Sequence, residues 1–214
     1  MCVRGVLPGL AGAIHSMLGN AHHSLGDFSQ AIKYHTQDLE IAKEVGDRAG
    51  EGKAYGNLGI AHHSLGDFSQ AIKYHTQDLA IAEEVGDRAG EGMSYALLGT
   101  GHMHLNEYVK AVAYFEAQHA LAVSLKLAHV QSHAALKMGI ALTLHVRAVR
   151  QGPSTGADKA PGPPSHSSAS ACLDDKVREA TKWLQAALDA GHGVARRQGG
   201  TRISAAFLGS GARL

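Results

Sequence analysis

The sequence predicts an all-α fold in which antiparallel helix pairs stack in a row as a solenoid. Residues 21–60 recur as residues 61–100 at a spacing of 40, and 33 of the 40 positions are identical. The segment AHHSLGDFSQAIKYHTQDL occurs in both copies without a change, and a more divergent third copy follows in the same phase. Self-similarity at a fixed period of this size indicates stacked units, each of which buries the surface that its neighbour leaves open.

Each repeat is predicted to contain two amphipathic helices. In the second copy, apolar residues at three- and four-residue steps mark the first helix: Tyr55, Leu58, Ala61 and Leu65. Gly66 ends this helix and Asp67 begins the next one, with Gln70 three residues further on as in a capping box. Because the connection is so short, the two helices must lie antiparallel.

The same phase, carried along the chain, gives three complete units and the first helix of a fourth. The predicted helices are 11–25, 27–45, 49–65, 67–85, 89–105, 107–126 and 128–150. The phase is then interrupted, because 12 residues separate Gly59 from Ala71 whereas 41 separate Gly139 from the next matching alanine, Ala180. A segment has therefore been inserted between the two helices of the fourth unit.

The repeat phase also predicts the domain organisation. An N-terminal segment, 1–10, precedes the helical body of residues 11–150. Residues 151–172 contain QGPSTGADKAPGPPSHSSASA, a composition that cannot bury a core, and we expect this insertion to be disordered. Residues 173–191 restore the spacing of a second helix and complete the fourth unit. Residues 192–214 are predicted to be an irregular basic tail.

Small residues recur where the two helices of each unit should cross. They are Gly19, Gly59 and Gly99 after a leucine in the first helix, and Ala31, Ala71 and Ala111 in the second. This pattern resembles the tetratricopeptide repeat, and the period of 40 with AYGNLG and SLGDFSQAIKYH is most similar to the G-protein-signalling-modulator subclass. The resemblance implies a right-handed superhelix whose first helices line a concave groove for extended peptides. No segment similar to a GoLoco motif is present, so regulation of Gα subunits is not implied.

Histidines occupy several places where the family has aromatic residues. His22, His62 and His102 stand at a tyrosine position, and His35 and His75 at the position that Phe115 fills in the third unit. We therefore expect His22 and His62 to be interior substitutes for that tyrosine. The adjacent pairs such as His62-His63 splay about 100° apart on a helix and cannot chelate together. The sequence predicts no metal site and no cofactor.

The exposed positions of the first helices are the candidate contacts for a partner. An asparagine amide both donates and accepts, so Asn20 and Asn57 could hold a peptide backbone without reading its side chains. The predicted partner-binding residues are Asn20, His23, Lys53, Asn57, His63, Thr100, Met103 and His104. A clamp for a C-terminal carboxylate is excluded, because the three places that hold cations in such tetratricopeptide domains are Ser16, Met93 and Leu97.

Composition narrows the function further. Twenty Lys and Arg balance nineteen Asp and Glu, and only 5% of residues are aromatic, which argues against a nucleic-acid binder. No apolar run is long enough to span a membrane, and Cys2 and Cys172 form no disulfide framework, so a cytoplasmic setting is expected. No catalytic motif is present. Asp38 and Asp78 are predicted to lie on outer, solvated helix faces.

These observations favour a protein-protein interaction scaffold or adaptor that is not an enzyme and holds a partner peptide in its groove. Two alternatives remain open at this stage. One is a structural segment of a larger solenoid, or of one that self-associates through open apolar ends. The other is the regulatory domain of a signalling enzyme, since fold does not determine function.

Overall fold

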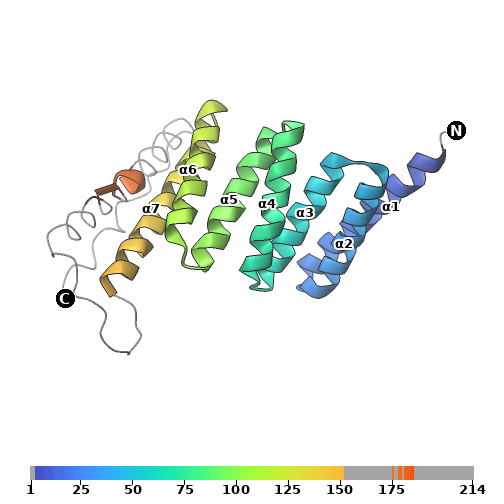
Figure 1. The fold of residues 1–214 in the computed structure, drawn as a ribbon, viewed down its shortest axis with the longest axis horizontal. Coiled ribbons are helices and arrows are strands. Elements are labelled where there is room, and N and C mark those ends of the chain that lie inside the picture. The colour runs from blue at the N-terminus through green and yellow to red at the C-terminus, as the bar shows by residue number, and fades with distance from the viewer. Residues whose placement is uncertain (1–2, 152–174, 176–177, 180, 186–214) are drawn as a thin grey trace, which may run out of the picture.

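The computed structural model describes residues 3–151, 175, 178–179 and 181–185, and within them it is helical without strands. Seven helices follow one another along residues 3–151 (Figure 1). They are α1 (Val3–Ser24), α2 (Phe28–Val45), α3 (Arg48–Ser64), α4 (Phe68–Val85), α5 (Arg88–His104), α6 (Tyr108–Ser124) and α7 (Ala128–Gln151). The predicted all-α class is therefore confirmed.

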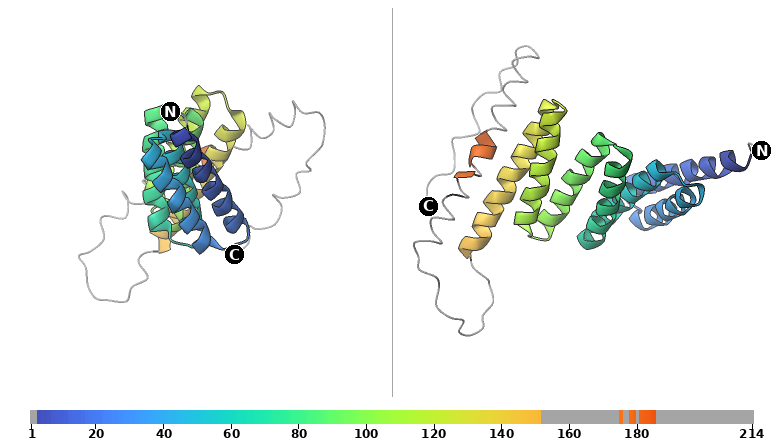
Figure 2. Two further views of the ribbon diagram at one scale, coloured as in Figure 1. Left: turned by 90° about the vertical axis from the view of Figure 1, so that its right-hand side faces the viewer. Right: turned by 45° about the horizontal axis from the view of Figure 1, so that its top comes forward.

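The helices pack almost entirely against their neighbours in sequence. Close contacts join each helix from α1 to α7 with the next one, and few residues of α1 reach α3. Figures 1 and 2 show the resulting row of antiparallel hairpins, with the two ends of the row far apart. This arrangement is the predicted solenoid, in which each unit depends on the adjacent units for burial.

The turns form as the repeated residues predict. Gly26 and Gly66 adopt φ of 79° and 81°, a left-handed conformation that glycine tolerates without steric strain. The carboxylates of Asp27 and Asp67 then each accept a 3.1 Å hydrogen bond from a backbone N–H in the first turn of the next helix. The third unit replaces this turn by Asn106 at φ 60°, and its helix α6 begins without a side-chain cap.

Helix boundaries agree with the sequence expectation within two residues from α2 to α7. Helix α1 differs, because it begins at Val3, eight residues before the expected start, and runs through Pro8 in its second turn. Pro8 lies beyond the first turn, and since proline has no backbone N–H, the hydrogen bond from position 8 to the carbonyl of Arg4 is absent. Of the predicted insertion, 151–172, only Gln151 is described, as the last residue of α7, and the predicted tail 192–214 lies outside the described residues.

Aromatic rings fill the helix crossings through the gaps that glycines leave. A Cβ added to Gly59 would lie 2.4 Å from Cε1 of His75, and one added to Gly99 would lie 2.6 Å from Cε1 of Phe115. His75 and Phe115 are 1% and 0% exposed. The histidine of unit two thus occupies the interior place that the phenylalanine fills in unit three.

Beyond α7, the described part of the chain returns to the solenoid. Trp183 packs against the core cluster that Ala111, Phe115 and Met138 form between α6 and α7. Its indole also lies edge-on to His119, with ring centroids 5.2 Å apart. The assignment of residues 173–191 to the second helix of the fourth unit stays a prediction, because only a few of these residues are described. No described helix combines the length and apolar character needed to cross a membrane.

Candidate partner-binding groove

Three consecutive hollows follow one another along the face that the first helices of the units line. Hollow one, of about 380 Å³, lies between α1, α2 and the start of α3. Hollow two, of about 470 Å³, is lined mainly by α3, α4 and α5, and hollow three, of about 420 Å³, mainly by α5, α6 and α7. Consecutive hollows share lining residues, such as Lys53 between the first two and Met93 between the last two. They therefore form one continuous groove.

The hollows are built from the same positions of successive units, 40 residues apart. This equivalence allows the chemistry of hollows two and three to be compared place by place. The equivalent lining pairs include Lys53 and Met93, Gly56 and Ala96, Asn57 and Leu97, Asp78 and Gln118, Val85 and Leu125, Asp87 and Leu127, and Gly90 and Val130.

Hollow two has a carboxylate in its floor. Ser94 Oγ donates a 2.7 Å hydrogen bond to Asp78 Oδ2, and Gly56 leaves the carboxylate uncovered, since an added Cβ would lie 3.2 Å from that oxygen. Burial raises the pKa of Asp78 above its usual value, with the Ser94 hydrogen bond opposing this effect. None of the ion pairs among the described residues includes Asp78. A carboxylate without a cation thus lies within the groove.

The prediction that Asp38 and Asp78 lie on outer faces is wrong. Asp78 follows the buried His75 by three residues and precedes the buried Ile81 by three, so all three side chains share the inner face of α4. Asp38 occupies the same place in α2, lines hollow one, and has its pKa raised by burial. Each aspartate follows, by three residues, a histidine at an aromatic core position. This spacing was the sequence signal that could have placed Asp38 and Asp78 on the inner face.

Hollow three is apolar. It is lined by the large apolar side chains of Ile60, Met93, Leu97, Leu121, Leu125, Leu127 and Val130, together with small residues. Gln118 stands in the place of Asp78, is 6% exposed, and has a buried amide oxygen without a hydrogen-bond partner in the described part of the chain. Arg88 is the charged residue of this lining. Hollow three therefore suits apolar side chains much better than hollow two does.

The predicted partner-binding residues fall into three groups, of which the first lines the groove. Asn20, Lys53 and Asn57 all line hollow two, where Lys53 and Asn20 are exposed. Asn57 is half-buried beside them. The structure thus brings together the two asparagines that the sequence singled out and a cation. Whether they bind a partner stays a prediction.

The predicted histidines lie instead where consecutive units meet. His23 Nε2 lies 3.0 Å from Ser64 Oγ, and His104 stacks on Phe68 with ring centroids 4.3 Å apart. His63 packs edge-on against His104 at 5.1 Å, and burial lowers its pKa, with His104 and Lys137 adding to this effect. No group of three or more histidine, cysteine or acidic residues in the described ranges is placed to hold a metal ion.

The last two predicted residues make internal contacts. Thr100 Oγ1 donates a 2.8 Å hydrogen bond to the carbonyl of Ala96, and Met103 packs against the core cluster between α6 and α7. Neither lines any of the three hollows. The sequence analysis missed the contributions of the second helices, such as Leu121 and Leu125, and that of Arg88.

Differences between the two nearly identical repeats concentrate at the groove. Only seven of the 40 aligned positions differ. Three of these positions line hollows two and three: 53 and 93, 56 and 96, and 57 and 97. A fourth, Ala54 in one copy, is Ser94 in the other, the residue that bonds Asp78. The helix crossings and turns are unchanged, so the repeats differ mainly in what they present to the groove.

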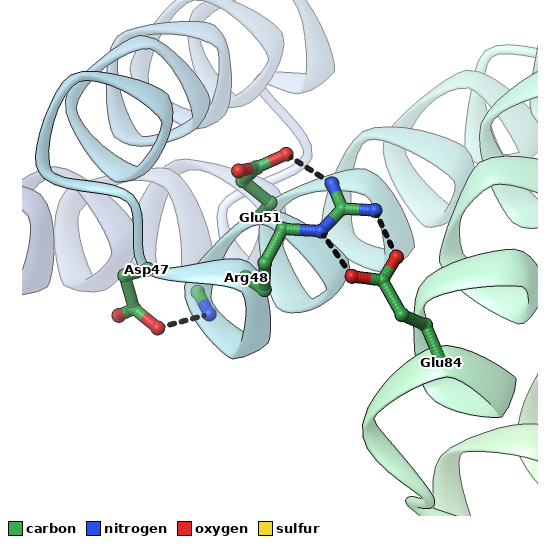
Figure 3. Close-up of polar contacts among 5 residues, drawn as sticks. Asp47, Arg48, Glu51 and Glu84 are labelled. Carbon is green, nitrogen blue, oxygen red and sulfur yellow. Dashed lines mark hydrogen bonds and ion pairs between the residues drawn. The ribbon is translucent and has the colours of Figure 1, made fainter.

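An arginine at the start of the first helix links the two helices of unit two (Figure 3). Arg48 Nη1 donates to Glu51 Oε2 at 2.7 Å, while Nε and Nη2 donate to the two carboxylate oxygens of Glu84 at 3.1 Å and 2.5 Å. Asp47 caps the same helix, since its Oδ1 accepts a 2.9 Å hydrogen bond from the N–H of Gly50. The guanidinium thus joins the beginning of α3 to the end of α4.

Comparison with known proteins confirms the predicted repeat. Residues 10–84 match the family model described as tetratricopeptide repeat. A 45-residue segment is 51% identical to human G-protein-signaling modulator 1, and it covers 21% of this chain but only 7% of that protein. The chain is thus similar to a small part of that relative.

Solved structures show the same fold at low sequence identity. The structure of BtubC from P. vanneervenii has a TM-score of 0.70 at 16% identity, with 96% of this chain and 72% of that chain covered. The tetratricopeptide domain of Arabidopsis FLU has a TM-score of 0.53 at 21% identity, with 55% and 98% covered. The predicted solenoid of helix pairs is confirmed by these likenesses, which concern the fold alone.

Proposed function

We propose that this protein is an interaction scaffold whose groove binds a segment of a partner protein. The observation that carries the proposal is the row of three contiguous hollows, together with the change of three lining positions between two repeats that are otherwise nearly identical: 53 to 93, 56 to 96 and 57 to 97. If this surface had no binding role, its lining residues would be expected to vary no more than the rest of the repeat. Tetratricopeptide repeats, which residues 10–84 match, are interaction modules, and this agrees with the proposal.

The groove offers complementary means of holding a peptide. In hollow two, the amides of Asn20 and Asn57 can donate to and accept from a peptide backbone, with Lys53 beside them. In hollow three, Met93 and Leu97 offer apolar contact, and Met93 is 64% exposed in the free protein. Covering such side chains drives association, at about 25 cal/mol per Å² of apolar surface. We place this adaptor function in the cytoplasm because the two cysteines form no disulfide framework.

A double substitution, Asn20→Ala with Asn57→Ala, tests the proposal. Partner capture should weaken while the circular dichroism spectrum stays unchanged, because neither asparagine belongs to the core. The control is Glu40→Gln, an exposed site on α2 outside all three hollows. Equal capture by the double variant, the control and the unchanged protein would refute the role of hollow two.

A second candidate function, assembly with another helical unit, rests on the outer face of α1. Leu18 is 39% exposed, whereas its equivalents Leu58, Leu98 and Met138 are 1%, 0% and 0% exposed. Leu58 packs with Leu39 of the preceding second helix, α2, and Met138 packs with Phe115 of the preceding second helix, α6. Sedimentation velocity at increasing concentration tests this candidate, since assembly through α1 should be weakened by Ile14→Lys. An unchanged sedimentation coefficient at all concentrations would exclude self-assembly.

A further inference from the structure

Hollow three contains Arg88, whose counterpart in the preceding repeat, Arg48, binds a carboxylate on each edge of its guanidinium group. Arg88 is equivalent to Arg48, and its Nη1 donates to Glu91 Oε2 at 2.6 Å, just as Arg48 Nη1 donates to Glu51. This shared contact holds both guanidinium groups in the same orientation at the start of their helices. Glu91 is 4% exposed and is therefore a firm support for Arg88.

The two arginines differ at the opposite edge of the guanidinium. In unit two, the Nε and Nη2 edge of Arg48 is occupied by Glu84. The residue 40 positions after Glu84 is Ser124, whose hydroxyl donates to the carbonyl of Leu121 in its own helix. No hydrogen bond or ion pair to Nε or Nη2 of Arg88 occurs among the described residues. Unit two thus shows which group fits this edge, namely a side-chain carboxylate held by two parallel hydrogen bonds.

The surroundings of Arg88 have also lost the anions present in unit two. Asp78 and Asp87, which line hollow two, are replaced by Gln118 and Leu127 in hollow three. Lys53 is replaced by Met93, so that Arg88 is the charged residue of an otherwise uncharged lining. Attraction between opposite charges strengthens where apolar surface excludes water. A carboxylate that entered hollow three would therefore meet one cation of the lining, and the nearest anion, Glu91, is bound to the other edge of Arg88 as Glu51 is to Arg48.

We propose that hollow three binds a partner segment in which an acidic side chain, flanked by apolar residues, takes the place against Arg88 that Glu84 takes against Arg48. This inference rests on the proposed function and names the class of partner. The flanking residues lie on Met93, Leu97, Leu121 and Leu125. Arg88 is not at one of the three clamp positions, Ser16, Met93 and Leu97, at which other tetratricopeptide domains hold a C-terminal carboxylate. The group that shows what fits this edge, Glu84, is a side-chain carboxylate.

The probe for this proposal is a library of short peptides tethered through their C termini, so that only side chains supply carboxylates. The full chain should select peptides with an acidic residue between apolar ones. A selected peptide should then lose about tenfold in affinity when its acid is replaced by the amide. Selection of peptides without an acidic residue, or no selection at all, would overturn the proposal.

Ser124→Glu is the decisive variant, because it supplies in the chain the carboxylate that we assign to the partner. It should rebuild the Arg48–Glu84 pair in unit three and weaken binding of the selected peptide by about tenfold. Ser124→Gln has the same size without the charge and should bind as the unchanged protein does. Equal binding to Ser124→Glu and Ser124→Gln would refute a carboxylate site at Arg88.

A second variant approaches the same contact from the arginine. Arg88→Gln alone would leave the buried Glu91 without its partner, so it is combined with Glu91→Gln. On this double variant, the acidic peptide and its amide version should bind equally. Arg48→Gln with Glu51→Gln, the matched change in unit two, should leave the preference for the acidic peptide intact. A preference that persists without Arg88 would contradict the proposal.

The outcomes separate this inference from the proposed function. If Leu97→Asp abolishes peptide binding while the Arg88 variants have no effect, the groove binds peptides but without the carboxylate contact. If Leu97→Asp also has no effect, the groove is not the binding surface and both proposals fail. A peptide that binds only with a free C-terminal carboxylate, and not when amidated, would assign Arg88 to chain ends and overturn the side-chain assignment.

Discussion

Hollows two and three are made by equivalent helices of successive units, yet they present different chemistry. Hollow two contains Lys53, Asn57 and the uncompensated carboxylate of Asp78, whereas hollow three presents Met93, Leu97 and Gln118 at the equivalent places. Their first helices, α3 and α5, belong to the two nearly identical repeats, whereas α6 and the turn at Asn106 before it come from the more divergent third copy. A difference in binding between the hollows can therefore be attributed to a few side chains rather than to a change in fold.

The comparison extends to the core beneath the hollows, and it predicts a large effect of pH. Both ring nitrogens of His75 are buried without a partner among the described residues, and burial lowers the pKa of His75 to about 4. In the unfolded chain the pKa of this histidine is near 6.5, so the ring is neutral in both states above that pH. As the pH falls towards 4, the unfolded state takes up a proton that the folded state does not, and the folded state loses stability. The loss should reach roughly 3 kcal/mol at pH 4.

His75→Phe should remove that loss, because Phe115 already fills the equivalent place in unit three. Urea unfolding at pH 7.5 and pH 4 measures the effect, and the variant should gain most at the lower pH. Phe115→His is the reciprocal change and should make stability more sensitive to acid. A similar pH dependence in all three proteins would show that the buried rings do not control acid stability.

Placing a charge in the apolar hollow should affect binding strongly. Leu97→Asp should weaken binding of a groove peptide by about 30- to 100-fold, because the carboxylate would be covered by apolar side chains. Asn57→Asp, at the equivalent place in the polar hollow, should weaken binding by no more than about tenfold, because it removes one amide donor and keeps the acceptor oxygen. Fluorescence polarisation with one labelled peptide measures both. Equal losses would mean that the two hollows are not chemically distinct for the ligand.

The helix crossing of unit two should be more sensitive to added volume than the floor of hollow three. Gly59→Ala places a methyl group 2.4 Å from the His75 ring and should destabilise the protein by about 1–3 kcal/mol. Gly92→Ala adds the same group 3.5 Å from Leu121, which is an ordinary contact, and should stabilise α5 slightly. Thermal unfolding of the two variants measures this contrast. A tolerated alanine at position 59 would argue against the close crossing.

The smallest expected effect concerns the carboxylate of hollow two. Because burial raises the pKa of Asp78, its ionised form opposes folding at neutral pH. Asp78→Asn should keep the hydrogen bond with Ser94 and raise stability at pH 7, whereas the gain should vanish below pH 3.8, where the carboxyl is protonated in both states. Chemical unfolding across this range measures it. A loss of stability at pH 7 would indicate a cation partner for Asp78.

The fold was predictable because every local signal in the repeat agrees with the others. The spacing of Leu58 and Ala61 predicts the helix, and Gly66 with Asp67 predicts the turn after it. The 40-residue period predicts that the units stack. The start of α1 was not predicted, because residues 3–10 lack the repeat pattern.

The candidate site was predictable only in part. Asn20, Lys53 and Asn57 were found because they lie on first helices, which the family resemblance places along the groove. The floor of the groove comes from second helices. Asp78 was predicted to lie on the outer face of such a helix, because charged residues are mostly solvated. Arg88 could not be distinguished from Arg48 by local sequence, since the difference lies 36 residues away, at Ser124.

Site-specific photo-crosslinking tests most directly the central claim that the groove holds a partner segment. A photoreactive residue is placed at position 93, in hollow three, or at position 40, an exposed site on α2 outside the hollows. After illumination with a bound peptide, mass spectrometry identifies the linked products. The groove account predicts a covalent product from position 93 and none from position 40. Equal products from both positions, or a product from position 40 alone, would contradict it.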